Sequence, residues 1–173
     1  MRFSTTPYFS VFRMAPVLAL VLFMTACTSY TKVSSEGVKA FRQDIKQNFP
    51  LIQKTEIRYS TPRVEVTYKL KEELNEAEVQ LLFTKTQAFM TSPSFQSEVV
   101  DGQYRIKYPS WGDPELAITL TVRGEDAAVY RFICMPENVE TDKDEPVYTH
   151  WYVYAEDDAE GKPYPDQKTE IKK

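Results

Sequence analysis

The sequence predicts an α+β domain in which two early helices pack on one face of a mostly antiparallel, meander-like sheet. Two stretches in the first half of the chain carry apolar residues at helical spacing, whereas alternation of apolar and polar residues dominates the second half. Helices gathered early and strands gathered late are typical of α+β folds rather than of alternating α/β folds.

The first predicted helix covers residues 35–49. Ser35 can cap its start, and Pro50 helps to end it. Its apolar side chains recur at helical spacing on one face: Val38, Phe41, Ile45 and Phe49.

Residues 55–70 alternate between apolar and charged side chains, which predicts a half-buried strand. Pro62 cannot donate a hydrogen bond to a neighbouring strand. We therefore expect the run to be bulged, split or at a sheet edge near Thr61.

The second predicted helix begins after Asn75. Asn75 with Glu78 three residues later resembles a capping box, and the helix should end near Thr91, before Pro93. Its apolar stripe is continuous: Val79, Leu82, Phe83, Thr86, Phe89 and Met90.

Residues 94–100 have two interpretations. They form a short helix opened by Pro93, which we favour, or they pair with residues 103–108 through an Asp101-Gly102 hairpin turn. Strands are then expected over 104–108, 115–123, 127–135 and 147–155, with an acidic loop over 136–146.

An uncharged, apolar run of residues 14–26 precedes Cys27. It is too short to cross a bilayer, which takes about 20 apolar residues, and it fits the apolar part of an export signal with Arg2 and Arg13 before it. Its end, Met24-Thr25-Ala26-Cys27, resembles the lipobox of bacterial lipoproteins, although Met replaces the usual Leu.

The lipobox resemblance covers the first 27 residues and implies lipid on Cys27 and cleavage before it. A diacylglycerol supplies two acyl chains, which is enough for stable anchoring. We expect a signal peptide at 1–26, a lipidated tether at 27–34, one α+β domain at 35–155 and a polar, flexible tail at 156–173. Because Thr28 rather than Asp follows the cysteine, the analogy implies the outer membrane in a two-membrane cell, or the outer face of the plasma membrane in a one-membrane cell.

The mature chain of 147 residues would carry 19 basic and 25 acidic residues, a formal charge of −6. This balance argues against a nucleic-acid partner, which favours clustered basic residues, and leaves membrane attachment to the lipid. If Cys27 carries lipid, Cys134 has no partner for an intramolecular disulfide, and a buried apolar role fits it best.

Catalytic and metal-binding patterns are weak. His150 is the single histidine, so a Cys134–His150 dyad or any triad depends on one residue. The carboxylates of 137–145 could hold Ca²⁺, but an EF-hand pattern is absent and a solvated acidic loop fits better. We therefore expect no enzyme, no cofactor and no metal site.

The aromatic residues suggest a binding surface. Alternation places Tyr148, Tyr152 and Tyr154 on one face of the last predicted strand, and Trp111 lies in a turn that could join them. Tyr and Trp combine apolar area with a polar group, which suits contact with sugar rings or protein. The alternative is that the helices bury this face.

These observations together predict an envelope lipoprotein with a non-enzymatic domain that binds a protein or an envelope glycan. A structural or assembly lipoprotein is the first alternative. A hydrolase of cell-wall or extracellular polymers, using His150 or the acidic loop, is the second.

Overall fold

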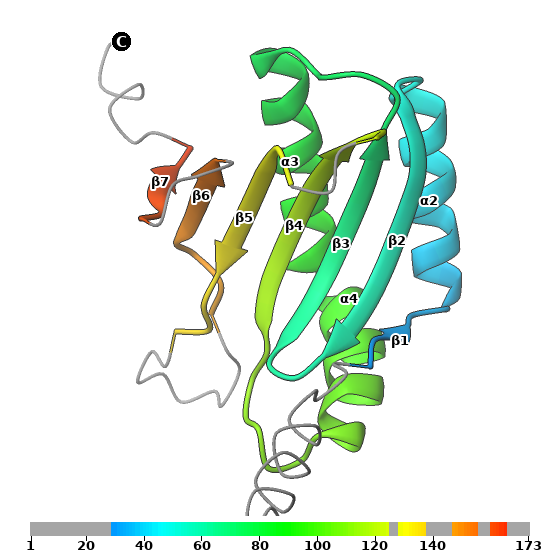
Figure 1. Cartoon of the computed structure of the whole chain (residues 1–173). Coiled ribbons are helices and arrows are strands. Elements are labelled where there is room, and N and C mark those ends of the chain that lie inside the picture. Colours follow the sequence, from blue (N-terminus) through cyan, green and yellow to red (C-terminus); the bar gives the residue numbers. More distant parts are fainter. Residues whose placement is uncertain (1–28, 125–127, 138–146, 156–159, 166–173) are drawn as a thin grey trace, which may run out of the picture.

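The computed structural model describes residues 29–124, 128–137, 147–155 and 160–165. The expected signal peptide, Cys27 and most of the acidic loop lie outside these residues. The described chain forms a seven-stranded sheet together with helices, so the domain is α+β as predicted (Figure 1). No helix in the described part is both long and apolar enough to cross a membrane.

The strands lie in the sheet in the order in which they occur in the chain. Neighbouring strands are antiparallel except β3 and β4, which are parallel. The strands are β1 (Thr31–Lys32), β2 (Ile52–Ser60), β3 (Arg63–Leu70), β4 (Glu115–Val122), β5 (Tyr130–Cys134), β6 (Trp151–Ala155) and β7 (Lys162–Tyr164).

Both predicted early helices are present. Helix α2 (Glu36–Asn48) has Ser35 as its N-cap, whose side chain accepts a hydrogen bond from the Val38 amide. Helix α3 (Glu76–Met90) begins with the expected capping box, in which Asn75 and Glu78 each accept the other's backbone N–H at 3.0 Å. Local side-chain hydrogen bonds thus define both helix starts.

The alternating run over 55–70 is split, as Pro62 indicates. A tight turn at Thr61 and Pro62 joins β2 to β3 as a hairpin. The end of the sheet that carries this turn is called the hairpin end below. From the opposite end of β3, the chain crosses back through α3, α4 (Pro93–Phe95) and η2 (Gln96–Arg105) before β4 begins beside β3. A parallel pair requires such a long crossover.

The predicted strand over 104–108 is wrong. The chain continues from α4 into η2, a helix with wide π-type turns, and Asp101-Gly102 lies inside it instead of forming a hairpin. Helical spacing buries Val99, Val100 and Tyr104 on one side. Burial of this stripe therefore outweighs the local turn preference of Asp-Gly.

Three boundaries also differ from the expectations. Thr31 and Lys32 of the expected tether pair with β2 as β1, and Val33 is buried. Lys162–Tyr164 of the expected flexible tail forms β7 and pairs with β6. Strand β6 begins only at Trp151, later than predicted. The two added strands are short segments that tertiary pairing, rather than local periodicity, makes extended.

Aromatic contacts and one buried hydrogen bond join the helices to the sheet. Phe83 of α3 packs against the rings of Phe132 on β5 and Trp151 on β6, with centroids 4.9 and 5.4 Å apart. The hydroxyl groups of Tyr68 on β3 and Thr86 on α3 lie 2.7 Å apart. Thr86 Oγ1 also donates a 2.7 Å hydrogen bond to the Leu82 carbonyl, so its contact with Tyr68 satisfies the buried tyrosine hydroxyl.

Candidate binding surface

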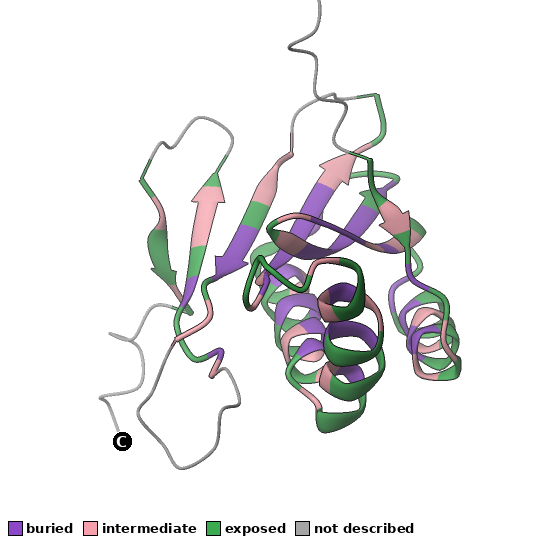
Figure 2. Ribbon diagram, turned by 90° about the horizontal axis from the view of Figure 1, so that it is seen from below, coloured by how far each residue is buried: buried purple, intermediate pink, exposed green. Residues whose placement is uncertain are grey.

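Tyr152 and Tyr154 lie on the side of β6 that faces away from Trp151, because successive side chains of a strand alternate. Trp151 is buried against Phe83, whereas Tyr152 is exposed and Tyr154 is half-buried. In Figure 2, β6 and β7 carry more exposed and intermediate residues than the buried centre of the sheet. The two tyrosines thus belong to an accessible surface.

The register of the sheet places other side chains beside the two tyrosines. Tyr152 is paired with Ile133 on β5 and with Pro163 on β7, and Tyr154 is paired with Arg131. Paired residues of neighbouring strands project to the same face. We call these five residues the tyrosine patch: Arg131, Ile133, Tyr152, Tyr154 and Pro163.

The ring of Tyr154 lies directly on the backbone of Gly161. A Cβ atom at Gly161 would come within 2.6 Å of the Tyr154 ring and 3.0 Å of the Tyr152 Cβ atom. Only glycine allows so close an approach between the segment before β7 and the tyrosines. The backbone at Gly161 therefore packs closely on the Tyr154 ring.

A buried polar network lies on the same sheet face, two strands away from the patch. Glu65 on β3 is only 5% exposed. Its carboxylate accepts a 2.6 Å hydrogen bond from Thr119 Oγ1 and bonds of 3.0 and 2.9 Å from Arg58 Nε and Nη2. Thr119 in turn is paired with Arg131, so the network runs up to the tyrosine patch.

The other two predicted surface residues lie elsewhere. Tyr148 is buried ahead of β6, and its hydroxyl donates a 2.9 Å hydrogen bond to the Pro114 carbonyl. Burial raises the pKa of this hydroxyl. Trp111 is exposed in the turn that precedes β4, at the hairpin end. The structure thus brings Tyr152 and Tyr154 together but separates both from Tyr148 and Trp111.

His150 forms a compact polar cluster with Glu137 and Thr149. Glu137 Oε1 lies 2.6 Å from His150 Nδ1 and accepts a 2.9 Å hydrogen bond from Thr149 Oγ1. These two hydrogen bonds hold the pKa of the Glu137 carboxyl below its usual value. Thr149 Oγ1 also lies 3.0 Å from Nδ1, so hydroxyl and carboxylate face the same ring nitrogen. In a catalytic triad, by contrast, one ring nitrogen of the histidine bonds to the nucleophile and the other bonds to the carboxylate. The cluster of His150, Glu137 and Thr149 does not have this arrangement.

Cys134 is not placed as a nucleophile. The side chain is buried, and desolvation, with a smaller effect of the Glu137 charge, raises the pKa of its thiol to about 12. A thiol in such surroundings stays protonated and unreactive at neutral pH.

Among the described residues, no group of three or more His, Cys, Asp or Glu side chains could hold a metal ion.

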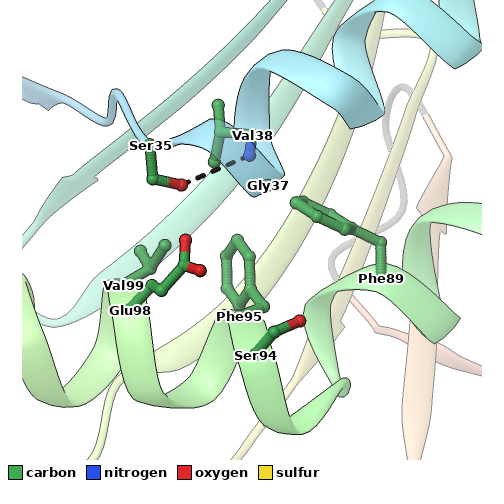
Figure 3. Close-up of a pocket in the computed structure, with 8 residues that line it drawn as sticks. All are labelled: Ser35, Gly37, Val38, Phe89, Ser94, Phe95, Glu98 and Val99. Carbon is green, nitrogen blue, oxygen red and sulfur yellow. Dashed lines mark hydrogen bonds between the residues drawn. The ribbon is translucent and has the colours of Figure 1, made fainter.

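A shallow pocket lies between the start of α2 and the α4–η2 segment (Figure 3). Its space of about 160 Å³ opens to solvent, and the Glu98 carboxylate points toward the first turn of α2, within 3.4 Å of where a Gly37 side chain would begin. Small-molecule sites usually enclose roughly 300–1,000 Å³. A negative charge near a helix N-terminus is stabilised by the helix dipole, so the position of the Glu98 carboxylate has a structural explanation.

The residues Arg131, Ile133 and Pro163 were not among the candidates from the sequence. Strand alternation alone could have placed Arg131 and Ile133 on one face of β5, but only the register shows that this face continues into Tyr152 and Tyr154.

Comparisons with protein-family models, with curated proteins and with solved structures found no match to this chain.

Proposed function

We propose that this protein is a lipid-anchored envelope protein whose single domain binds a protein or glycan of the envelope through the tyrosine patch. Lipid on Cys27 holds it at the outer membrane of a two-membrane cell, or at the outer face of a one-membrane cell. The lipobox-like Met24-Thr25-Ala26-Cys27 supports the anchor. The exposed Tyr152 beside the half-buried Tyr154 is the observation that supports binding.

In this proposal, the helices cover one face of the sheet and the tyrosine patch lies on the opposite face, where Arg131, Tyr152 and Pro163 are exposed. Three contacts support that arrangement: Tyr59 packs on Tyr104 of η2, Tyr68 bonds to Thr86 of α3, and Phe132 packs on Phe83 of α3. The register puts these three sheet residues on one face and the tyrosine patch on the other.

The chemistry of the patch suits a macromolecular partner. It combines two tyrosines and an exposed arginine, residue types that are enriched at interfaces, with the exposed Pro163, whereas Ile133 is buried. Gly161 limits the freedom of the Tyr154 ring, so less conformational entropy is lost on binding. Aromatic and guanidinium groups of this kind suit contact with a protein or a glycan.

Affinity capture from envelope extract tests the proposal. The purified mature protein is the bait, with Tyr152→Ala and Tyr154→Ala as test variants and Leu81→Ala as the matched control, because Leu81 is an exposed apolar residue of α3. We expect each tyrosine variant to weaken retention of one partner by about tenfold or more, as at interface hot spots. Equal retention by all variants would refute the assignment of the tyrosine patch.

A further inference from the structure

Four of the six large apolar or aromatic side chains that are exposed in the described residues lie at the hairpin end. They are Tyr30, Ile106, Trp111 and Met135, at 46, 73, 61 and 50% exposure, whereas Leu81 lies on α3 and Tyr152 projects from the sheet face in the tyrosine patch. Scattered exposed apolar residues are normal, but a concentration at one end marks a contact surface.

Strand pairing and hydrogen bonds show that these four residues lie at the hairpin end. Tyr30 precedes β1, whose Thr31 pairs with Tyr59 near the end of β2. Lys107, next to Ile106, donates a hydrogen bond from Nζ to the hydroxyl of Thr31. The C-terminal end of η2 and the start of β1 therefore meet at the hairpin end.

Trp111 and Met135 belong to the same end. Trp111 lies between Tyr108, whose ring packs on Tyr59, and Glu115, whose amide donates a 2.9 Å hydrogen bond to the Pro62 carbonyl in the hairpin turn. Met135 directly follows Cys134, which pairs with Leu116 at the start of β4. Covalent neighbours and pairing thus fix both positions.

The chain reaches the proposed lipid anchor from this same end. The Arg58 guanidinium lies 4.0 Å from the centre of the Tyr30 ring, which fixes the point where the domain begins. Cys27 is three residues before Tyr30, and an extended chain spans at most roughly 3.5 Å per residue. A lipid on Cys27 therefore brings the bilayer surface within roughly 10 Å of Tyr30, whatever path the residues between them take.

Two arginines at this end are paired with carboxylates of the protein. Arg63 donates to Glu115 at 2.7 Å, and Arg105 forms ion pairs with Asp101 and Asp113. Paired charges cost less to bring toward a bilayer than isolated ones. The sequence over 138–146 is acidic, and residues 137 and 147 on its two sides pair at this end, which favours a zwitterionic lipid surface over an anionic one.

We propose that the hairpin end of the domain rests on the phospholipid surface, with Tyr30, Ile106, Trp111 and Met135 in contact with the interfacial layer. Tyr and Trp favour that depth because one part of each ring system is apolar and the other is polar. This contact rests on the proposed lipid anchor and adds a second attachment to it. The strands then point away from the membrane, and the tyrosine patch faces sideways, open to a partner.

The two tryptophans of the chain provide the test, because Trp111 is exposed and Trp151 is 2% exposed in the core. Mature protein purified from cells that express the full chain is placed in phosphatidylcholine vesicles, with or without lipids brominated near the headgroup. Bromine quenches tryptophan only at short range. We expect Trp111 emission to fall roughly twofold in brominated vesicles, as for a ring at the interface.

Two variants act as controls. Trp111→Phe should abolish the quenching, and Leu81→Trp in the Trp111→Phe background should not restore it, since Leu81 lies on α3 away from the hairpin end. Mass spectrometry of the mature N-terminus and flotation with vesicles are measured in parallel. If Cys27 carries lipid and the protein floats with the vesicles, but Trp111 is not quenched, the proposed membrane contact is wrong and the lipid anchor stands. Absence of lipid on Cys27 would overturn the anchor and the contact that rests on it.

Discussion

Thr119 on β4 donates a 2.6 Å hydrogen bond to the carboxylate of Glu65 on the neighbouring strand β3. Both side chains are nearly inaccessible to water. Arg58 supplies the balancing charge from β2, so three adjacent strands share one polar network. A buried carboxylate is tolerated here because each of its oxygens has a hydrogen-bond donor.

Removal of the Glu65 carboxylate should destabilise the domain. Glu65→Ala leaves the partly exposed Arg58 without its counter-charge and Thr119 without its acceptor, and we expect the free energy of unfolding to fall by about 2 kcal/mol. Urea denaturation followed by circular dichroism measures this change. Glu56→Ala is the matched control on β2, because Glu56 pairs with Lys54 in a more exposed position and should change stability by less than about 0.5 kcal/mol. Equal effects of the two variants would contradict the role given to the network.

The two early helices were predictable because their signals are local. Ser35 and the Asn75–Glu78 pair bond to backbone groups within one turn, and the buried stripes follow helical spacing over three or more turns. Pro62 likewise indicated where the strand run divides. The sequence alone is enough to predict a structural element wherever interactions between residues close together in the chain determine that element.

The remaining features depend on contacts between distant segments. The π-helix η2 overrides the turn preference of Asp101-Gly102, and β7 pairs with β6 while its Tyr164 packs on Phe83 from another part of the chain. Of the candidate surface residues, alternation was enough to group Tyr152 with Tyr154. Tyr148 differs, because its hydrogen bond to Pro114 places it in the core before β6 begins.

Phe83 should be the most sensitive position of α3. Its ring contacts those of Phe132, Trp151 and Tyr164, with centroids 4.9, 5.4 and 4.7 Å away, so it links the helix to β5, β6 and β7. Phe83→Ala should lower the free energy of unfolding by about 3–5 kcal/mol, because it removes buried area and leaves a cavity. Leu81→Ala on the same helix should have an effect below about 0.5 kcal/mol. A loss below about 1 kcal/mol in Phe83→Ala would contradict this packing.

The Cys134 thiol should resist modification in the folded protein. With a pKa of about 12, roughly one thiol in ten thousand is ionised at pH 8, and the side chain is buried as well. In a Cys27→Ser variant Cys134 is the sole cysteine, so reaction with Ellman's reagent reports on it alone. We expect no reaction over hours in buffer and complete reaction in urea. Rapid labelling of the folded variant would contradict the buried position.

His150→Ala should raise the pKa of the Glu137 carboxyl toward its usual value. The hydrogen bond from His150 is the main cause of the lowered pKa, with a smaller contribution from Thr149. A carboxyl whose pKa is lowered in the folded state stabilises that state above the unfolded pKa, and this contribution is lost as pH falls through the folded pKa. Carbon-13 NMR titration of the glutamate carboxyl groups measures the shift, with Thr149→Ala giving a smaller one. An unchanged Glu137 pKa in His150→Ala would contradict the cluster geometry.

The most direct test of the proposed function is photo-crosslinking in living cells. A benzophenone amino acid replaces Tyr152 in the tyrosine patch, and in a matched strain it replaces Leu81, which is also exposed but lies on α3. The proposal predicts a crosslink from position 152 to one envelope component, and a much weaker one or none from position 81. Crosslinking from position 81 alone, or equally from both positions, would contradict binding through the tyrosine patch.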